Sequence, residues 1–280
     1  MKKKIGLIDL HIDEFHANHY PDWFKAAPSG DGFEIAGAWE ESAGNGVRDL
    51  AAWSKDMGIK AFSSLEELIA ECDCLCVLAP SNPETHLRLA ELPLKSGKDV
   101  FIDKPFAPDR KSAEKLFEMA DQGGCRLFSS SALRFGGELS KIRGTFPAEF
   151  MSTTGGGSNF PEYAIHQLEM IVSVMGTGAK EVVCDIALEN TLHFTITFED
   201  GRKSTMTYNN FLPFSGAICG NGQTALFSDC SDIFPNMLEA MLQFYNGGEP
   251  PVKREETIAI AAMLDASIRA SQNPGNVVAI

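Results

Sequence analysis

Four short apolar runs in the first half of the chain constrain its fold most. They cover residues 4–10, 33–39, 74–79 and 99–102, with predicted helices between them. None alternates apolar with polar residues, so each is expected to be buried on both faces. Such strands, separated by helices, predict a parallel sheet covered by helices on both sides. Ligands of such a sheet bind at the carboxyl ends of its strands. Those ends are Asp9, Glu40, Ala79 and Asp103.

The pattern changes near residue 145. Residues 181–188, 192–198 and 203–209 alternate apolar with polar side chains, and Asp200-Gly201 favours a tight hairpin between the last two runs. This half therefore predicts a mainly antiparallel sheet with helices against it. We expect an α/β chain with a doubly wound parallel sheet in residues 1–122. An α+β domain should follow in residues 123–280, and its last helices can pack back on the first domain.

Charge and composition limit the class of partner. The 280 residues carry a net charge of −14, which argues against nucleic acid, since phosphate contacts need clustered Lys and Arg. The sequence contains no run of about 18 apolar residues, so we expect no helix that spans a membrane. The basic start is followed by too short an apolar stretch for a signal peptide. We expect a cytoplasmic protein with small-molecule ligands.

The seven cysteines also favour a cytoplasmic protein. Cys72, Cys74 and Cys76 alternate along one strand and lie on one side of it. Three side chains in such a row do not readily pair with one another, so we interpret them as reduced thiols. A metal site at this row is the alternative, although no Cys-x-x-Cys spacing or neighbouring His supports it.

Lys104 is the first candidate for chemistry. It follows a buried strand of the parallel sheet, and Pro105 stiffens the loop that carries it. A directed ammonium can bind a substrate hydroxyl or polarise a carbonyl. The alternative is an ordinary solvated lysine of a loop.

A predicted helix carries the second candidate. Glu162, His166 and Glu169 are spaced by four and three residues, so they share one helix face. A histidine flanked by carboxylates has a fixed tautomer and raised basicity, which suits a general base. A partly exposed polar face with a hydrogen-bonded histidine is the alternative.

Several segments together resemble the glucose–fructose oxidoreductase / inositol dehydrogenase (Gfo/Idh/MocA) family. They are Ser64 to Leu68, Val77 to Pro80, Thr85-His86 and Gly97 to Pro105. The similarity covers most of the first domain and, more loosely, residues 160–175 and the sheet after them. It implies a Rossmann-type first domain that binds a dinucleotide and a second domain that binds substrate.

The resemblance also implies roles for single residues. Lys104 resembles the family lysine that contacts both the nicotinamide and the reacting hydroxyl, and His166 resembles the histidine that moves the proton. Glu162 stands where the family has an aspartate, so we count it with the catalytic residues. Arg134 and Glu169 are implied substrate contacts. The implied cofactor contacts are Asp9, His11, Glu40, Ala79, Pro80, Asp103 and Lys104.

The chain departs from the family where a dinucleotide would bind. The glycines of Gly-x-Gly-x-x-Gly, which allow close approach of a pyrophosphate, are replaced by Asp9, His11 and Glu14. Carboxylates there repel a diphosphate. Glu40 keeps the acid that favours NAD over NADP. NAD binding is therefore expected to be weak or lost.

The same loop contains His11, His16 and His19 among three acids. This cluster could hold a metal, but its spacing matches no strong metal signature, so we favour a solvated polar loop and expect no metal.

Two functions follow. The retained Lys104, Glu162 and His166 favour an NAD(P)-dependent oxidoreductase that acts on a secondary alcohol of a sugar or cyclic polyol. The lost glycines favour the alternative, a non-catalytic relative that binds a sugar-like ligand or a partner chain without a dinucleotide.

An apolar row suggests assembly. Leu192, Phe194, Ile196 and Phe198 lie on one face of a predicted strand. If that face points away from the helices, the row needs another cover. The family resemblance implies pairing through this sheet, so we expect a homodimer or homotetramer.

Overall fold

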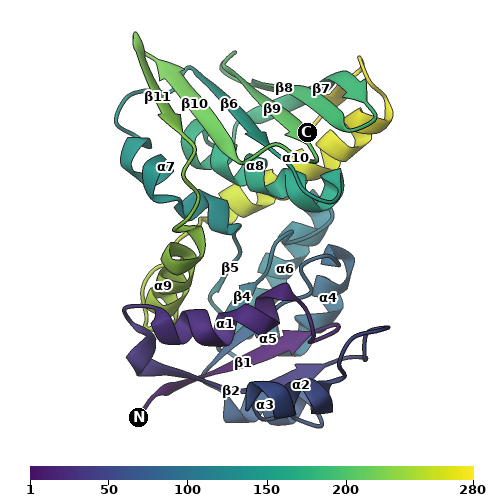
Figure 1. The fold of residues 1–280 in the computed structure, drawn as a ribbon, viewed down its shortest axis with the longest axis vertical. Coiled ribbons are helices and arrows are strands. Elements are labelled where there is room, and N and C mark those ends of the chain that lie inside the picture. Colours follow the sequence, from purple (N-terminus) through teal and green to yellow (C-terminus); the bar gives the residue numbers. More distant parts are fainter. The chain divides into compact units, whose positions relative to one another are not determined.

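The computed structural model describes residues 1–280, which form two compact units (Figure 1). The first comprises residues 1–107, 111–129 and 237–253, and the second comprises residues 108–110, 130–236 and 254–280. The first unit thus extends beyond residue 122 and includes a returning segment near the C-terminus. None of the helices combines the length and apolar character needed to cross a membrane.

The first unit contains a five-stranded, wholly parallel sheet with the order β2-β1-β3-β4-β5. Its elements are β1 (Lys3–Asp9), α1 (Phe15–Ala26), η1 (Gly30–Gly32), β2 (Phe33–Glu40), α2 (Leu50–Met57), α3 (Leu65–Glu71), β3 (Cys74–Val77), η2 (Pro83–Thr85), α4 (His86–Leu89), α5 (Glu91–Lys95), β4 (Asp99–Ile102), α6 (Arg110–Gly123), β5 (Leu127–Phe128) and most of α9 (Ile233–Tyr245). Strands β1, β3 and β4 are mainly buried runs, as their lack of polar alternation predicts, whereas the edge strand β2 also has half-exposed and exposed positions. A single parallel bridge between Ala38 and Ala61 stands beyond β2, where a further strand would lie.

The second unit contains a seven-stranded sheet with the order β11-β10-β6-β9-β8-β7-β12. All neighbours are antiparallel except the parallel pair β6 and β9. Helices α8 and α10 pack against this sheet (Figure 1). The elements are η3 (Ala132–Phe135), α7 (Gly137–Ile142), β6 (Phe150–Gly155), α8 (Phe160–Met175), β7 (Ala179–Leu188), β8 (Thr191–Phe198), β9 (Lys203–Asn209), β10 (Ser215–Gly220), β11 (Gln223–Phe227), α10 (Arg254–Gln272) and β12 (Val277–Ala279). The predicted change from a parallel to a mainly antiparallel sheet is confirmed.

The apolar row on β8 faces its own helices. Phe194, Ile196 and Phe198 are buried, and the Phe194 ring stacks on Phe160 of α8 with centroids 5.0 Å apart. The alternate residues Thr195 and Thr197 lie on the other, half-exposed face. The three buried residues are therefore core and only Leu192 of the row is half-exposed, so the row supplies no continuous apolar surface that a second subunit must cover.

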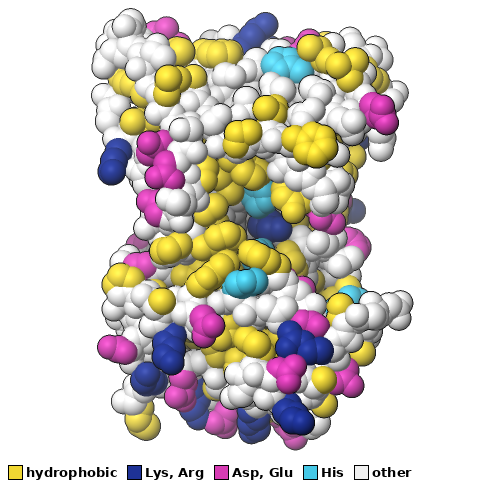
Figure 2. Space-filling view, in the orientation of Figure 1, with side chains coloured by type: hydrophobic (Ala, Val, Ile, Leu, Met, Phe, Trp, Pro, Cys, Tyr) yellow, Lys and Arg dark blue, Asp and Glu magenta, His cyan; other side chains and the backbone are white.

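The charges on the visible surface and the state of the cysteines can be compared with what the composition indicates. On the face shown in Figure 2, acidic and basic side chains are mixed with apolar ones, and neither charge forms a continuous patch. All seven cysteines are free thiols.

Candidate functional site

The order of the first sheet defines its ligand edge. Strands β2 and β3 flank β1, so the chain's path reverses direction at the carboxyl ends of β1 and β3. Open parallel sheets bind ligands at such a reversal point. Asp9 ends β1 there, and Ala79 follows β3.

Asp9 bridges this reversal point. Its Oδ1 accepts hydrogen bonds from Ala79 N at 3.1 Å and His11 N at 3.3 Å. The side chain is almost fully buried, and Oδ2 has no hydrogen-bond partner. Burial, with the nearby charge of Glu14, raises the pKa of Asp9 well above its usual value. Ala79 has a φ of +65°, which is uncommon outside glycine and fixes its N–H toward Asp9.

Glu14 caps the helix that a diphosphate would approach. It is the N-cap of α1, and its carboxylate accepts from His16 N at 2.8 Å and from Ala17 N. These are the first amides of the helix, the donors that bind phosphate in glycine-loop proteins. Burial raises the pKa of Glu14, and the charge of Asp103 adds to that increase.

Glu40, at the end of β2, also holds backbone amides. Its two oxygens accept from Ile12 N at 3.0 Å and Leu50 N at 2.7 Å. The carboxylate therefore ties the loop after β1 to the start of α2. A ribose hydroxyl would have to share or displace these bonds.

The three histidines of the loop have separate partners. His11 Nδ1 lies 2.6 Å from Ser42 O, and His19 Nδ1 lies 2.6 Å from Phe15 O. His16 Nδ1 bonds the Asp103 carboxylate. No group of three His, Cys, Asp or Glu side chains is arranged to hold a metal ion.

Asp103 and Lys104 follow β4 at the same edge. Asp103 is buried against His16, and its Oδ1 accepts from Lys104 N at 2.8 Å. Burial alone would raise the pKa of Asp103, but His16 and Lys104 hold it below the usual value. The backbone of Lys104 is thereby fixed by a buried carboxylate that is itself bonded to His16.

His86 fixes the other side of the Lys104 loop. It is fully buried, with Nδ1 2.9 Å from Phe106 O and Nε2 2.7 Å from Leu78 O. It joins the chain after β3, next to Ala79 and Pro80, to the chain after β4. Burial lowers its pKa despite the two carbonyl groups.

His166 lies on α8 in the second unit. Its Nδ1 is 2.6 Å from Ser131 Oγ, and the same hydroxyl oxygen accepts from Leu133 N. The edges of Tyr163 and Phe214 pack near the ring, with centroids 5.7 and 5.3 Å away. The imidazole thus contacts a serine that the sequence patterns did not indicate.

Glu162 and Glu169, the acids predicted to flank His166, lie in different surroundings. Glu162 is half-buried in the first turn of α8, where its N–H donates to Asn159. Glu169 is buried and accepts from Ser131 N at 3.1 Å and Ser130 Oγ at 3.3 Å. Burial raises its pKa, although Arg134 opposes that effect.

Arg134 is a buried structural partner of these groups. Its Nε donates to Glu169 at 2.7 Å and its Nη1 to Glu256 at 2.6 Å, and the residue is 4% exposed. Nη2 is buried without a partner. The resemblance implied substrate contact for Arg134 and Glu169. The structure instead pairs them with each other, and any contact with substrate remains a prediction.

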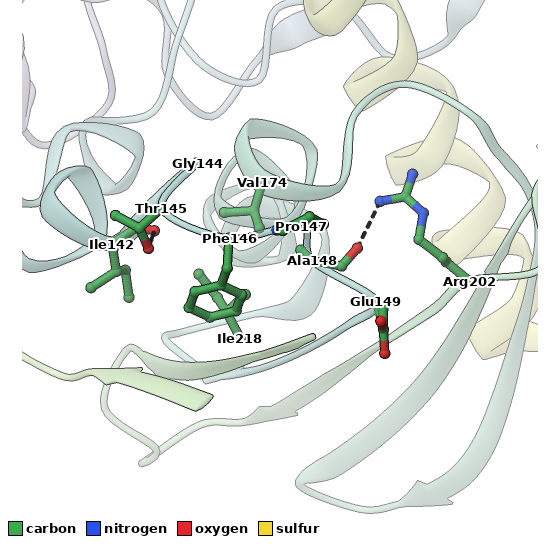
Figure 3. Close-up of a pocket in the computed structure, with 10 residues that line it drawn as sticks. All are labelled: Ile142, Gly144, Thr145, Phe146, Pro147, Ala148, Glu149, Val174, Arg202 and Ile218. Carbon is green, nitrogen blue, oxygen red and sulfur yellow. Dashed lines mark hydrogen bonds between the residues drawn. The ribbon is translucent and has the colours of Figure 1, made fainter. Parts of the chain in front are cut away.

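A pocket of about 660 Å³ in the second unit is lined by other residues, among them Phe146, Glu149 and Arg202 (Figure 3). Arg202 on its wall donates to Ala148 O at 3.1 Å and Met175 O at 2.9 Å. Glu149 accepts from Asn221 N. Because none of the residues that line it is among those predicted to carry chemistry, the pocket is a weaker candidate than the sheet edge.

Comparisons with known proteins identify the first domain. Residues 12–131 match the model of the oxidoreductase family with an NAD-binding Rossmann fold, Gfo/Idh/MocA. An uncharacterised oxidoreductase of Schizosaccharomyces pombe is 31% identical over 121 residues, 43% of this chain and 31% of that protein. UDP-N-acetylglucosamine 3-dehydrogenase of Acidithiobacillus ferrooxidans is 32% identical over 120 residues, 42% of this chain and 34% of that enzyme. These alignments span about a third of the relatives' lengths.

The similarity of fold extends over both units. The WlbA dehydrogenase of Bordetella pertussis, solved with NADH and UDP-GlcNAcA, aligns over all of this chain and 99% of its own, with a TM-score of 0.79 and 18% identity. At this identity the alignment shows the fold alone. Residues 12–131 of the chain are thus similar to the Gfo/Idh/MocA oxidoreductase family, and both units share the fold of its solved dehydrogenases.

Proposed function

We propose that the chain is an NAD-dependent oxidoreductase that acts on a secondary alcohol of a sugar or cyclic polyol. The main support is the Lys104 loop at the ligand edge, fixed on one side by Asp103 and His16 and on the other by His86. The relatives that act on or contain a UDP-sugar support this substrate class. We also propose that the first domain is of the dinucleotide-binding type and that the second domain binds substrate.

The proposed chemistry divides between two side chains. The Lys104 ammonium would bind the oxygen of the reacting hydroxyl, and His166 would accept its proton. Ser131 Oγ can accept Nδ1–H of His166, and that tautomer makes Nε2 the basic nitrogen. A bound nicotinamide would supply the hydride acceptor. Glu162 would add negative charge near the imidazole.

The occupied amides favour a second candidate function. Asp9, Glu14 and Glu40 accept backbone hydrogen bonds that a dinucleotide would otherwise compete for. A non-catalytic relative that binds a sugar-like ligand or a partner chain would not need those donors. Cytoplasmic location and a homodimer or homotetramer remain proposals for either candidate.

Nicotinamide fluorescence during titration of the purified protein with NADH and NADPH separates the two candidates. The oxidoreductase should bind NADH weakly and NADPH more weakly still, because Glu40 repels a 2′-phosphate. It should also reduce NAD with at least one member of a panel of polyols and nucleotide sugars. A folded protein that binds neither cofactor would favour the non-catalytic candidate.

A further inference from the structure

The cofactor of the family and the residues at the ligand edge disagree in charge. A dinucleotide brings an anionic diphosphate to the helix after the first strand. Here the first amides of that helix already bond the Glu14 carboxylate. The Asp9 carboxylate spans the reversal point between β1 and Ala79. A diphosphate that approaches these amides therefore meets two carboxyl groups.

The groups around this pair do not neutralise it fully. Asp103 and His16 form a buried hydrogen-bonded pair of their own. Burial raises the pKa values of Tyr20 and Cys76 well above their usual ranges, so both are neutral near pH 7. The negative charges of Asp103 and Glu14 contribute to both increases, so Tyr20 and Cys76 lie near the acids at this edge. Lys104 contributes one positive charge beside Asp103.

The more distant acids have partners. Asp13 bonds the Arg48 guanidinium at 2.7 Å. Glu40 is held by two backbone amides. Asp9, Glu14 and Glu40 have no ion pair with a Lys or Arg, and of these Glu14 is the acid whose charge acts on buried Asp9. The buried and unpartnered Oδ2 of Asp9 is an oxygen at which a proton can reside.

We propose that Asp9 and Glu14 form a proton-accepting carboxyl pair, and that a dinucleotide binds this chain together with one proton. This inference rests on the proposed function, and it means that pH regulates binding at the proposed cofactor site. Protonation removes one negative charge from the pair, while its carbonyl oxygens can still accept backbone hydrogen bonds. The diphosphate then meets the remaining donors with less repulsion.

The sign of the pH dependence follows from linkage. The pair is already disposed to hold a proton, since its burial raises both pKa values. A bound diphosphate raises them further, because negative charge nearby favours the neutral form. Affinity for the dinucleotide should therefore increase as the pH falls from the pKa of the pair in the complex to its pKa in the free protein. Uptake of one proton changes Kd about tenfold per pH unit in that window.

Isothermal titration calorimetry with NAD⁺ tests the proposal. Titrations at several values between about pH 5 and about pH 9 give Kd, and two buffers of different ionisation enthalpy at one pH give the number of protons taken up. We expect about one proton per NAD⁺. Glu14→Gln and Asp9→Asn should each reduce that number and tighten binding at the alkaline end.

Asp49→Asn is the matched control. Asp49 is an exposed N-cap that accepts from Ala52 N at 2.8 Å on α2, so this variant also neutralises a capping carboxylate of the same unit. It should bind NAD⁺ as the unmodified protein does. Thermal unfolding of each variant verifies that it is folded.

The outcomes separate the inference from the function. NAD⁺ binding without proton uptake, and with a Kd independent of pH, would overturn the carboxyl-pair proposal and leave the oxidoreductase proposal intact. Absence of NAD⁺ binding at every pH, in the folded protein and in both variants, would overturn both proposals.

Discussion

Asp9 carries a buried carboxylate oxygen without a partner, and this has a consequence for stability. Burial raises its pKa in the folded chain, whereas the unfolded chain has an ordinary value. The resulting stability is fully present below the unfolded pKa and is lost as the pH rises through the folded pKa. Asp9→Asn should therefore increase the free energy of unfolding at neutral pH. The expected gain is about 1.4 kcal/mol for each unit that separates the two pKa values.

Urea unfolding at about pH 5 and about pH 8 measures this effect. The unmodified protein should lose more stability between the two values than Asp9→Asn. The amide oxygen of asparagine can keep the bonds to His11 N and Ala79 N, so a large loss of stability at both values would contradict our account of this residue.

Ser131 is expected to act through His166. Ser131→Ala removes the hydroxyl 2.6 Å from Nδ1, so the ring loses the contact that sets its tautomer and direction. If the chain is a dehydrogenase, kcat should fall by about tenfold to a hundredfold with little change in KM. The pH–rate profile should shift, and Ser131→Thr should restore activity. Equal activity and an unchanged profile in Ser131→Ala would exclude the role.

Among the elements, a buried ion cluster joins η3, α8 and α10. Arg134 is the only cation bonded to Glu169 in this cluster, so Arg134→Met leaves a buried carboxylate without its charge partner. We expect a loss of about 3–5 kcal/mol in the free energy of unfolding. Adding Glu169→Leu should recover part of it. Arg269→Met is the control, since Arg269 pairs with Asp265 on an exposed surface and should cost less than about 1 kcal/mol.

Most elements followed from local patterns. Continuous apolar runs gave the parallel strands, and Asp200-Gly201 marked the hairpin between β8 and β9. Alternation shows that the apolar residues of β8 share one face of the sheet, but it does not show whether that face is toward the helices or away from them. The burial of Phe194, Ile196 and Phe198 and the stacking of Phe160 on Phe194 show which face is core.

The candidate site was only partly readable from the sequence. Lys104 and His166 were identifiable from their positions after a strand and on a helix. The partners that fix them were not, because His16 and Asp103 are 87 residues apart and Ser131 and His166 are 35 residues apart. Contacts at such separations arise from the fold, and no local periodicity records them. The run Ser129-Ser130-Ser131 after a buried strand was the available signal.

At the scale of the whole molecule, the proposed chemistry needs side chains from both compact units. Lys104 belongs to the first unit and His166 to the second. We predict that the two side chains act on one substrate hydroxyl. Kinetics can test this prediction without a bound structure.

A double-mutant cycle in turnover makes that test. Lys104→Ala and His166→Asn should each lower kcat by about a hundredfold or more, the scale of a positioned proton-transfer group. If both side chains serve the same hydroxyl, loss of one removes most of the benefit of the other, so the double variant should be little slower than the slower single variant. Lys115→Ala, on the exposed surface of α6, should keep full turnover and serve as the control. A double variant whose loss equals the product of the two single losses would show that Lys104 and His166 act independently, and the shared-hydroxyl mechanism would then be wrong.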